Sequence, residues 1–464
     1  MRRPALAGLW VALLVMPAAA HIGSPDVFLE GFAGPYRLLV TVRPPAAIPG
    51  VADVEVLTTS DDVNDVHLVP TPLTGVAARF APVADRAVRS NDDRRLFTGH
   101  LWMMNAGAWQ VRVTVNGDRG EGTLSVPVPT LPQTTLAMTP GLRITLWAFM
   151  LLLASGFVAI IAAMARESRL GAGEALDARS RRRGRIAGAI TAAAMAVILY
   201  LGNMWWTVEA TAYDRYVYKP LQATPSLPQN GILRLDLHDP GWISSRRMDD
   251  FVPDHGHVMH LFVVSPALDR LWHLHPAEVS AGRFEQALPS IPAGSYEMFA
   301  DVIHATGVPE TITGQFTTTG MGGTPLTGDD SGWALGHEYE TSIEWVRDST
   351  PLVSRKLTLF TFRVLDRSGQ PATDLELYMG MPGHAVFVRH DRKVFAHVHP
   401  SGSAPMAALN LAMPNVNPHA MHASATPSTV TFPYGFPLPG QYKIFVQVKR
   451  GGAIITSAFD ADVK

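Results

Sequence analysis

Two long apolar runs interrupt a chain that otherwise mixes hydrophobic and polar positions. Residues 145–165 and residues 186–207 contain no charged side chain and no histidine. Each run is long enough for a helix to cross about 30 Å of hydrocarbon. Gly184, Gly188 and Ala192 recur at intervals of four residues, a spacing that lets two helices approach closely. We therefore expect the two runs to form a transmembrane helical hairpin.

The segment between these runs, residues 166–185, is rich in arginine. Short loops with an excess of Lys and Arg stay in the cytoplasm, so residues 21 to about 143 and those after about 208 are expected outside. Trp147 and Trp205-Trp206 lie at the ends of the runs that face outward, where Trp is enriched. The pattern predicts an integral protein of the cytoplasmic (inner) membrane whose bulk lies in the periplasm.

The first twenty residues have the layout of a secretory signal peptide. A basic start at Met1-Arg2-Arg3 precedes an apolar stretch and then small residues up to Ala20, which is the order found in cleavable signals. We predict a signal peptide over residues 1–20, with an uncleaved N-terminal anchor as the alternative. Either reading exports the chain that follows.

Outside the apolar runs, hydrophobic and polar positions alternate at the period of β-strands. Val111, Val113 and Val115 alternate with polar residues, as in a half-buried strand. Asn116-Gly117 is a hairpin-type turn signal. Short strands with turn signals about every ten residues predict an immunoglobulin-like sandwich over residues 21–140.

The C-terminal half contains an internal repeat. The first copy carries His260-Leu-Phe-Val-Val and Leu271-Trp-His273-Leu-His275-Pro276, and the second carries His384-Ala-Val-Phe-Val and Phe395-Ala-His397-Val-His399-Pro400. Copies of this size are whole domains rather than solenoid units. We predict two β-sandwich repeats over residues 231–320 and 333–464, with residues 208–230 as a linker. The expected fold class is mainly β with a transmembrane helical hairpin, and its outer domains are immunoglobulin-like or cupredoxin-like sandwiches.

Composition narrows the chemistry. The chain has 464 residues, of which 47% are hydrophobic. Its formal net charge is −2, so nothing indicates a nucleic-acid surface. It has no cysteine, which excludes disulfides, thiolate metal sites and thiol nucleophiles. It has 17 His and 18 Met, residues that also bind borderline and soft metals.

Each repeated hairpin is expected to gather three imidazoles. Centring the turn of the second copy on Asp391-Arg392 places His384 opposite His399, and directly opposed residues share a face with Cβ atoms about 5 Å apart. His397 is two residues from His399 and shares that face. Three convergent nitrogens suit Cu(II), Zn(II) or Ni(II). His260, His273 and His275 have the same spacing in the first copy, although its turn is less regular.

Residues just upstream of each hairpin add further candidate ligands. These are His255, His257 and Met259 in the first copy and Met381 in the second. Thioether and imidazole ligands together favour copper, with zinc as the alternative metal. Residues 406–422, which include His419, Met421 and His422, read as a flexible loop that could load a metal. In the competing interpretation, the repeated histidines are structural and bind loop carbonyls, and the methionines fill the core.

The N-terminus is a second candidate site. Cleavage after Ala20 would leave His21 first, and an α-amine together with its own imidazole chelates copper. His67 and His100 are candidate partners, with Met103 and Met104 near in sequence.

Several of these segments resemble known families. His384 to Pro400, together with the Pro439-Gly440-Gln-Tyr442 strand, looks like the C-terminal domains of uncharacterised bacterial exported proteins with a His-x-His-Pro hairpin. Residues 36–49 and 107–113 resemble YtkA-like and FixH-like sandwich domains, and an N-terminal His after cleavage is similar to the copper-resistance protein C family. The resemblance implies periplasmic β-sandwiches, some of which handle copper.

The leading functional hypothesis is a membrane-anchored periplasmic metal-binding protein for copper trafficking, buffering or sensing. The alternative is a membrane-anchored scaffold, without metal, that binds a partner protein through edge strands and loops. An enzyme is not expected, because no nucleophile elbow, phosphate loop or metalloprotease helix is present. Asp254, Asp301 and Glu344 are available carboxylates, but the sequence does not place them near the hairpins.

Overall fold

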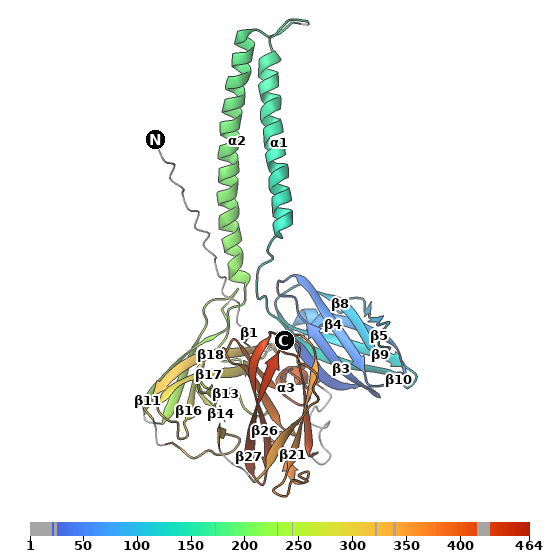
Figure 1. Ribbon diagram of the computed structural model, residues 1–464, viewed down its shortest axis with the longest axis vertical. Coiled ribbons are helices and arrows are strands. Elements are labelled where there is room, and N and C mark those ends of the chain that lie inside the picture. Colours follow the sequence, from blue (N-terminus) through green and yellow to red (C-terminus); the bar gives the residue numbers. More distant parts are fainter. Residues whose placement is uncertain are drawn as a thin grey trace, which may run out of the picture. The chain divides into compact units, whose positions relative to one another are not determined.

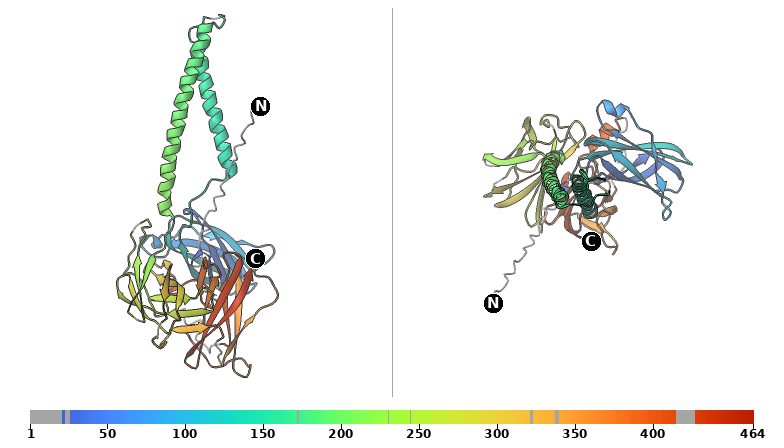
Figure 2. Two further views of the ribbon diagram at one scale, coloured as in Figure 1. Left: turned by 60° about the vertical axis from the view of Figure 1, so that its left-hand side comes forward. Right: turned by 90° about the horizontal axis from the view of Figure 1, so that it is seen from above.

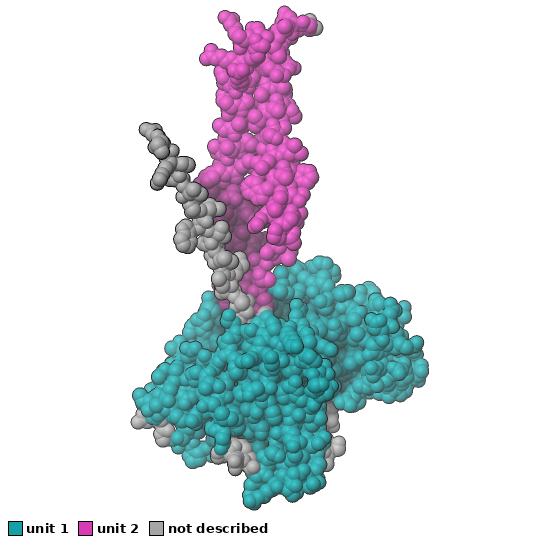
Figure 3. Space-filling model, viewed as in Figure 1, with its two compact units in different colours: residues 1–131, 220–240, 246–464 teal, residues 132–219, 241–245 magenta. Residues whose placement is uncertain are grey.

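The protein is mainly β with two long helices, as the sequence predicts (Figure 1). The computed structural model describes residues 21–22, 26–171, 173–229, 231–243, 245–320, 323–336, 340–414 and 427–464. It divides into two compact units, coloured separately in Figure 3. One contains residues 1–131, 220–240 and 246–464, and the other contains residues 132–219 and 241–245.

The helices are α1 (Pro140–Glu167) and α2 (Ala178–Tyr213), followed by the short η2 (Asp214–Tyr216). Among the described residues, these two helices are long and apolar enough to cross a membrane, and their apolar windows are not buried. They run side by side (Figures 1 and 2). A Cβ on Gly184 would lie 2.9 Å from the Cβ of Arg166, and one on Gly188 would lie 3.2 Å from the Cβ of Ala162. The small residues therefore permit the close packing that their spacing predicts.

The N-terminal sandwich packs one sheet against another. The first sheet has the order β2-β3-β4-β8-β7 and the second β10-β9-β5-β6. Its strands are β2 (Val27–Ala33), β3 (Tyr36–Arg43), β4 (Gly50–Thr58), β5 (Val63–Pro72), β6 (Asp85–Arg86), β7 (Val88–Arg89), β8 (Leu96–Met103), β9 (Gly107–Gly117) and β10 (Gly120–Thr130), with η1 (Val76–Arg79) after β5. The alternating Val111, Val113 and Val115 all lie in the core between these sheets.

The first repeat also has two layers of sheet, in the orders β11-β12-β16-β15 and β18-β17-β13-β14-β19. Its strands are β11 (Gln222–Gln229), β12 (Ile232–His238), β13 (Met259–Val264), β14 (Arg270–Leu274), β15 (Ala277–Ser280), β16 (Arg283–Ala287), β17 (Gly294–Ile303), β18 (Pro309–Thr318) and β19 (Ser331–Ala334). The prediction of a linker over residues 208–230 is wrong at both ends. Helix α2 continues to Tyr213, and β11 pairs with β12.

The second repeat pairs a sheet of order β1-β24-β23-β26-β22, with β27 beside β26, and a sheet of order β20-β21-β25. Its strands are β1 (His21–Ile22), β20 (Ser342–Val346), β21 (Thr358–Leu365), β22 (Leu375–Glu376), β23 (His384–Arg389), β24 (Val394–Val398), β25 (Thr429–Tyr434), β26 (Gly440–Arg450) and β27 (Ala453–Val463). The loop expected over residues 406–422 begins instead with the helix α3 (Met406–Ala412), whose first turn is buried. His419, Met421 and His422 lie outside the described residues.

The two repeats pack face to face through β13 and β23. Phe262 and Val264 of β13 share a buried cluster with Val386 and Val388 of β23, whereas the intervening residues face the core of their own repeat. Because successive side chains of a strand point to opposite faces, both strands are buried on both sides. This explains their nearly unbroken apolar sequence. His260 and His384 lie on the faces that meet the other repeat.

Candidate metal centre

Both hairpins have the register that places three histidines together. In the second repeat Ala385 pairs with Val398 and Val388 with Phe395, which confirms the expected alignment. In the first repeat Leu261 pairs with Leu274, so the two hairpins are equivalent despite their different turns. Within each triplet, one ring nitrogen from every histidine lies within 4.8 Å of the others, and each group could hold a metal ion.

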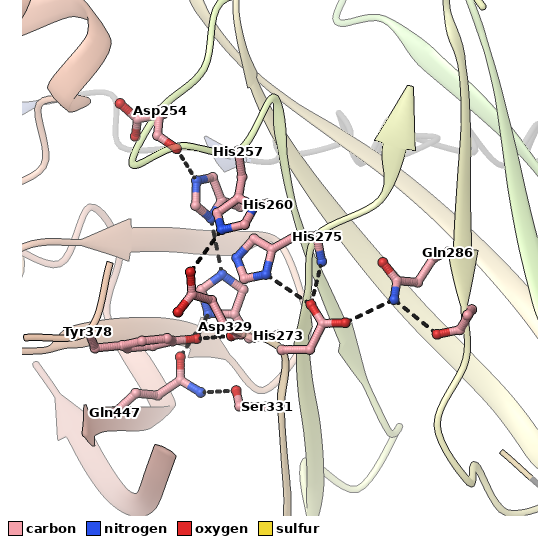
Figure 4. A network of polar contacts seen from close by, with 12 residues as sticks. Asp254, His257, His260, His273, His275, Gln286, Asp329, Ser331, Tyr378 and Gln447 are labelled. Atoms are coloured by element: carbon pink, nitrogen blue, oxygen red, sulfur yellow. Dashed lines mark hydrogen bonds and ion pairs between the residues drawn. The ribbon is translucent and has the colours of Figure 1, made fainter. Parts of the chain in front are cut away.

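In the first repeat, His260 Nδ1 and His273 Nε2 face each other (Figure 4). His260 Nε2 donates to the carbonyl oxygen of Asp254 at 3.0 Å. His273 Nδ1 donates to Gln447 Oε1 at 2.9 Å, since the amide nitrogen of Gln447 itself donates to Ser331. A neutral imidazole carries a single N–H. The remaining nitrogens, His260 Nδ1 and His273 Nε2, therefore present lone pairs to each other across 3.2 Å.

The third member of this triplet is His275. Its Nδ1 donates to Asp330 Oδ1 at 2.9 Å, and the other oxygen of Asp330 accepts from Gln286 at 3.1 Å. Its Nε2 is buried without a hydrogen-bond partner among the described residues. A histidine whose far nitrogen donates to a carboxylate is the usual arrangement around protein-bound metals, because the carboxylate fixes the tautomer and the ring orientation.

The second repeat reproduces this pattern. His384 Nε2 donates to the carbonyl oxygen of Tyr378 at 3.1 Å, which leaves His384 Nδ1 facing His397 Nε2 at 3.1 Å. The other nitrogen of His397 lies 3.6 Å from the carboxylate of Asp301. His399 completes the triplet, and its Nδ1 is buried without a hydrogen-bond partner in the part of the chain that the structure describes.

His255 belongs to the first repeat but reaches the second triplet. Its Nδ1 donates to the carbonyl oxygen of Met379 at 3.0 Å, and its Nε2 lies 3.2 Å from His399 Nε2. His255, His399 and Asp254 form a third group that could hold a metal ion. Both His255 and Met379, its counterpart in the second repeat, have φ of 50°, and the bridges Asp254–His257 and Tyr378–Met381 close corresponding turns.

His257 is the most accessible of these rings. Its side chain is 28% exposed, against 4% for His275, and the two rings stack with centroids 3.9 Å apart. His257 Nε2 lies 3.1 Å from the carboxylate of Asp329, which is also part-exposed. This pair therefore lies where the buried cluster meets solvent.

The thioether candidates are placed differently. Met259 lies on the face of β13 opposite His260 and packs in the core of the first repeat. Met381 is fully buried in the apolar cluster that contains Met406 and Leu409. Both side chains therefore pack among hydrophobic residues.

The side chain of His21, on which the predicted N-terminal site depends, lies outside the described residues. The backbone of His21 pairs with Val394 in the second repeat, whereas His67 and His100 lie on separate sheets of the N-terminal sandwich. His100 Nδ1 contacts the Asp53 carboxylate at 2.8 Å.

Burial sets the protonation of the centre. Loss of water lowers the pKa of His260, His273, His384 and His399 well below 6.5, and the neighbouring imidazoles lower each pKa further. Burial also lowers the pKa of His275, although the hydrogen bond that His275 donates to Asp330 acts in the opposite direction. These rings are therefore neutral at physiological pH, and neutral imidazole is the form that binds metals.

Sequence reasoning named Asp301 without placing it near the hairpins, and it missed Gln447. Asp301 pairs with His260 across β17 and β13, and Gln447 pairs with His384 across β26 and β23. The only local signal is that each lies in the strand after a proline–glycine turn. Asp254 and Asp301 lie at the cluster, whereas Glu344 lies exposed on β20.

Comparison with known proteins identifies one family match. A family described as "Domain of unknown function (DUF8832)" matches residues 339–464, which cover most of the second repeat. No curated protein matches the chain. The family therefore covers about a quarter of the sequence and carries no functional description.

The solved structures that match this chain are only distantly similar to it. Dimeric latent PorU from Porphyromonas gingivalis is 10% identical with a TM-score of 0.15, and the match covers 95% of this chain and 34% of PorU. The native conformation of E. coli alpha-2-macroglobulin is 10% identical with a TM-score of 0.17, covering 95% and 20% respectively. A chimeric titin Z1Z2 is 10% identical with a TM-score of 0.13, covering 53% and 94%. The chain thus spans about a third of PorU, and TM-scores this low support no functional argument.

Proposed function

We propose that this chain is a membrane-anchored metal-binding protein, that its metal is copper, and that the two histidine triplets are the ligands. Zinc is the alternative metal. The first triplet is His260, His273 and His275, and the second is His384, His397 and His399. The function would be copper trafficking or buffering at the outer face of the membrane.

One observation carries the proposal: in both repeats buried imidazoles turn ring nitrogens toward each other, and in the first repeat both facing nitrogens are bare. The pairs are His260 with His273 at 3.2 Å and His384 with His397 at 3.1 Å. Two lone pairs at this distance repel, and a buried polar atom without a partner costs about 1–3 kcal/mol. A cation bound between the nitrogens removes the repulsion and gives each nitrogen a partner. Ligand nitrogens on one tetrahedral ion lie roughly 3.3 Å apart, close to the separations of these pairs.

The donor set favours copper. The triplets offer imidazole nitrogens, and the chain contains no thiolate. Imidazole binds Zn(II), Cu(II) and Ni(II), and among divalent ions affinity is greatest for Cu(II). Because Met259 and Met381 lie in apolar cores, the case rests on imidazole donors and does not depend on a sulfur ligand.

Anchoring and location belong to the same proposal. Many large apolar side chains of α1 and α2 are exposed, including Leu151, Leu152 and Leu153. Such a surface is stable in hydrocarbon rather than in water. The arginine-rich residues between the helices would stay in the cytoplasm, which assigns the β-rich unit to the periplasm. The signal peptide over residues 1–20 lies outside the described residues and stays a prediction.

The alternative is a scaffold in which the histidines only organise the core. It is supported by the fact that one nitrogen of His260, His273 and His384 is already bonded to a neighbouring group. It does not account for the nitrogens that face one another. Metal binding therefore discriminates between the two functions.

The test uses the full chain in detergent, stripped with a chelator and titrated with Cu(II), Cu(I) and Zn(II). We expect two sites with binding tighter than micromolar, and His275→Gln or His399→Gln should weaken binding at the altered triplet by at least about 10–100-fold. His390→Gln is the matched control, since His390 lies exposed in the turn of the same hairpin. Binding no tighter than micromolar, or equal affinity in all variants, would refute the metal assignment.

A further inference from the structure

The two triplets occupy one interior region rather than separate sites. The ring of His397 from the second repeat lies 5.5 Å from that of His260 and 5.6 Å from that of His273, both in the first repeat. His273 and His384 lie 6.4 Å apart across the same interface. The two shorter separations are close to the longest within each triplet, where the centroids lie 4.7–5.4 Å apart in the first and 4.6–5.3 Å apart in the second. Imidazoles of different repeats are therefore neighbours.

Each repeat also supports the ligands of the other. Gln447 of the second repeat accepts the hydrogen bond that fixes His273 of the first. Asp301 of the first repeat faces the outer nitrogen of His397 of the second. Gln447 and Asp301 occupy corresponding places, each opposite the first histidine of its own triplet. Neither triplet is fully oriented by its own repeat.

His255 shows that one repeat also offers a candidate ligand to the triplet of the other. It comes from the first repeat, yet its Nε2 lies 3.2 Å from His399, and its ring lies 5.2 Å from that of His384. Its carbonyl-bound Nδ1 leaves Nε2 as the nitrogen directed to the second triplet. The second triplet can thus take a fourth imidazole from the first repeat.

We propose that the two triplets form a single dinuclear metal centre between the repeats, holding two ions close enough to interact. The inference rests on the proposed function and adds the number of ions and their proximity. Ring separations across the interface match those within one triplet, so ions bound to the inward nitrogens share one compartment. Paired metal ions in proteins commonly lie about 3.5–4 Å apart.

The experiment measures copper content and magnetic coupling on the purified full chain. After loading with Cu(II) and removal of excess metal, we expect two copper ions per chain. Electron paramagnetic resonance should show a coupled pair, through a half-field transition or an integrated signal well below the copper content. One bound ion, or two ions with full and independent signals, would overturn the dinuclear centre while leaving metal binding intact. No bound copper would instead refute the proposed function.

A double substitution tests which triplet holds each ion. His384→Ala combined with His397→Ala removes ligands of the second triplet, so one ion should remain, with an isolated signal that integrates to its full copper content. His390→Ala in the same hairpin should keep the coupled pair. Retention of coupling in the double variant would contradict the proposal. If circular dichroism shows that the double variant is misfolded, the spectrum of the unaltered protein decides the question.

Discussion

His304 lies outside the metal centre, in a buried group of charged side chains. Its Nδ1 lies 2.7 Å from Asp250, and its Nε2 lies 3.5 Å from Glu310. Glu310 also pairs with Arg246, which in turn pairs with Asp239. Burial alone would lower the pKa of His304, but hydrogen bonds and attraction from Glu310 and Asp250 outweigh it and raise the pKa above 6.5.

This shift predicts how stability depends on pH. Because the folded state binds the His304 proton more tightly than the unfolded state, the stabilisation is complete below pH 6.5 and is lost as pH rises through the raised pKa. His304→Gln should therefore destabilise the protein by about 2 kcal/mol at acidic pH and by less at alkaline pH. Thermal melts of the full chain at pH 6 and pH 9 measure the difference.

His238→Gln is the control for this prediction. His238 is exposed and contacts Gln222 rather than a carboxylate, so its loss should have little effect at either pH. A His304→Gln effect of equal size at both pH values would show that the protonated ring does not contribute.

At the scale of elements, the sequence predicts the strand pairing within the β-hairpins. It predicts the packing between α1 and α2 only in part. Side-chain period and turn position fix which residues of β23 and β24 oppose each other, and the observed pairing follows that register. The same period places Met259 and His260 on opposite faces of β13. Its expected role as an accessory ligand rests on residue chemistry, whereas the strand geometry directs Met259 into the core of the first repeat.

The helical pair makes a separate prediction. A Cβ on Gly184 would lie 3.0 Å from the carbonyl oxygen of Ala162, so Gly184→Leu should force α1 and α2 apart at a cost of about 1–3 kcal/mol. The double substitution Ala162→Cys and Gly188→Cys reports the distance between the helices. A Cβ on Gly188 would lie 3.2 Å from the Cβ of Ala162, close to the about 3.5–4.5 Å between the Cβ atoms of a disulfide. Oxidation should join them, and Gly184→Leu should prevent it.

The control for the helical pair is Gly202→Leu. Nothing lies within 4 Å of a Cβ at Gly202, so cross-linking should persist in that variant. Loss of maleimide labelling, followed by mass spectrometry, measures the disulfide. Equal cross-linking with Leu at either position would mean that Gly184 does not set the approach of the helices.

For the whole molecule, the orientation in the membrane is testable by labelling. The chain has no cysteine, so Ala175→Cys between the helices or Ser280→Cys on β15 supplies the sole thiol. Both positions are exposed. In intact spheroplasts an impermeant maleimide should label Ser280→Cys, and it should label Ala175→Cys only after lysis. The opposite pattern would reverse the proposed topology.

The sequence by itself determined the elements and their local faces. Long uncharged runs specify helices that need an apolar surrounding, and period-2 alternation specifies strands and the grouping of His384, His397 and His399. These features depend on residues close in sequence. For that reason they can be read without knowing how distant segments pack.

Only the tertiary structure decided how the hairpins meet. Strand β13 is apolar on both faces, so its sequence does not reveal which face packs on its own repeat and which on the other. Gln447 lies 174 residues from His273, the ring that it orients. Such contacts follow from the burial of surfaces far apart in the chain, and that packing converts two histidine hairpins into one shared interior cluster.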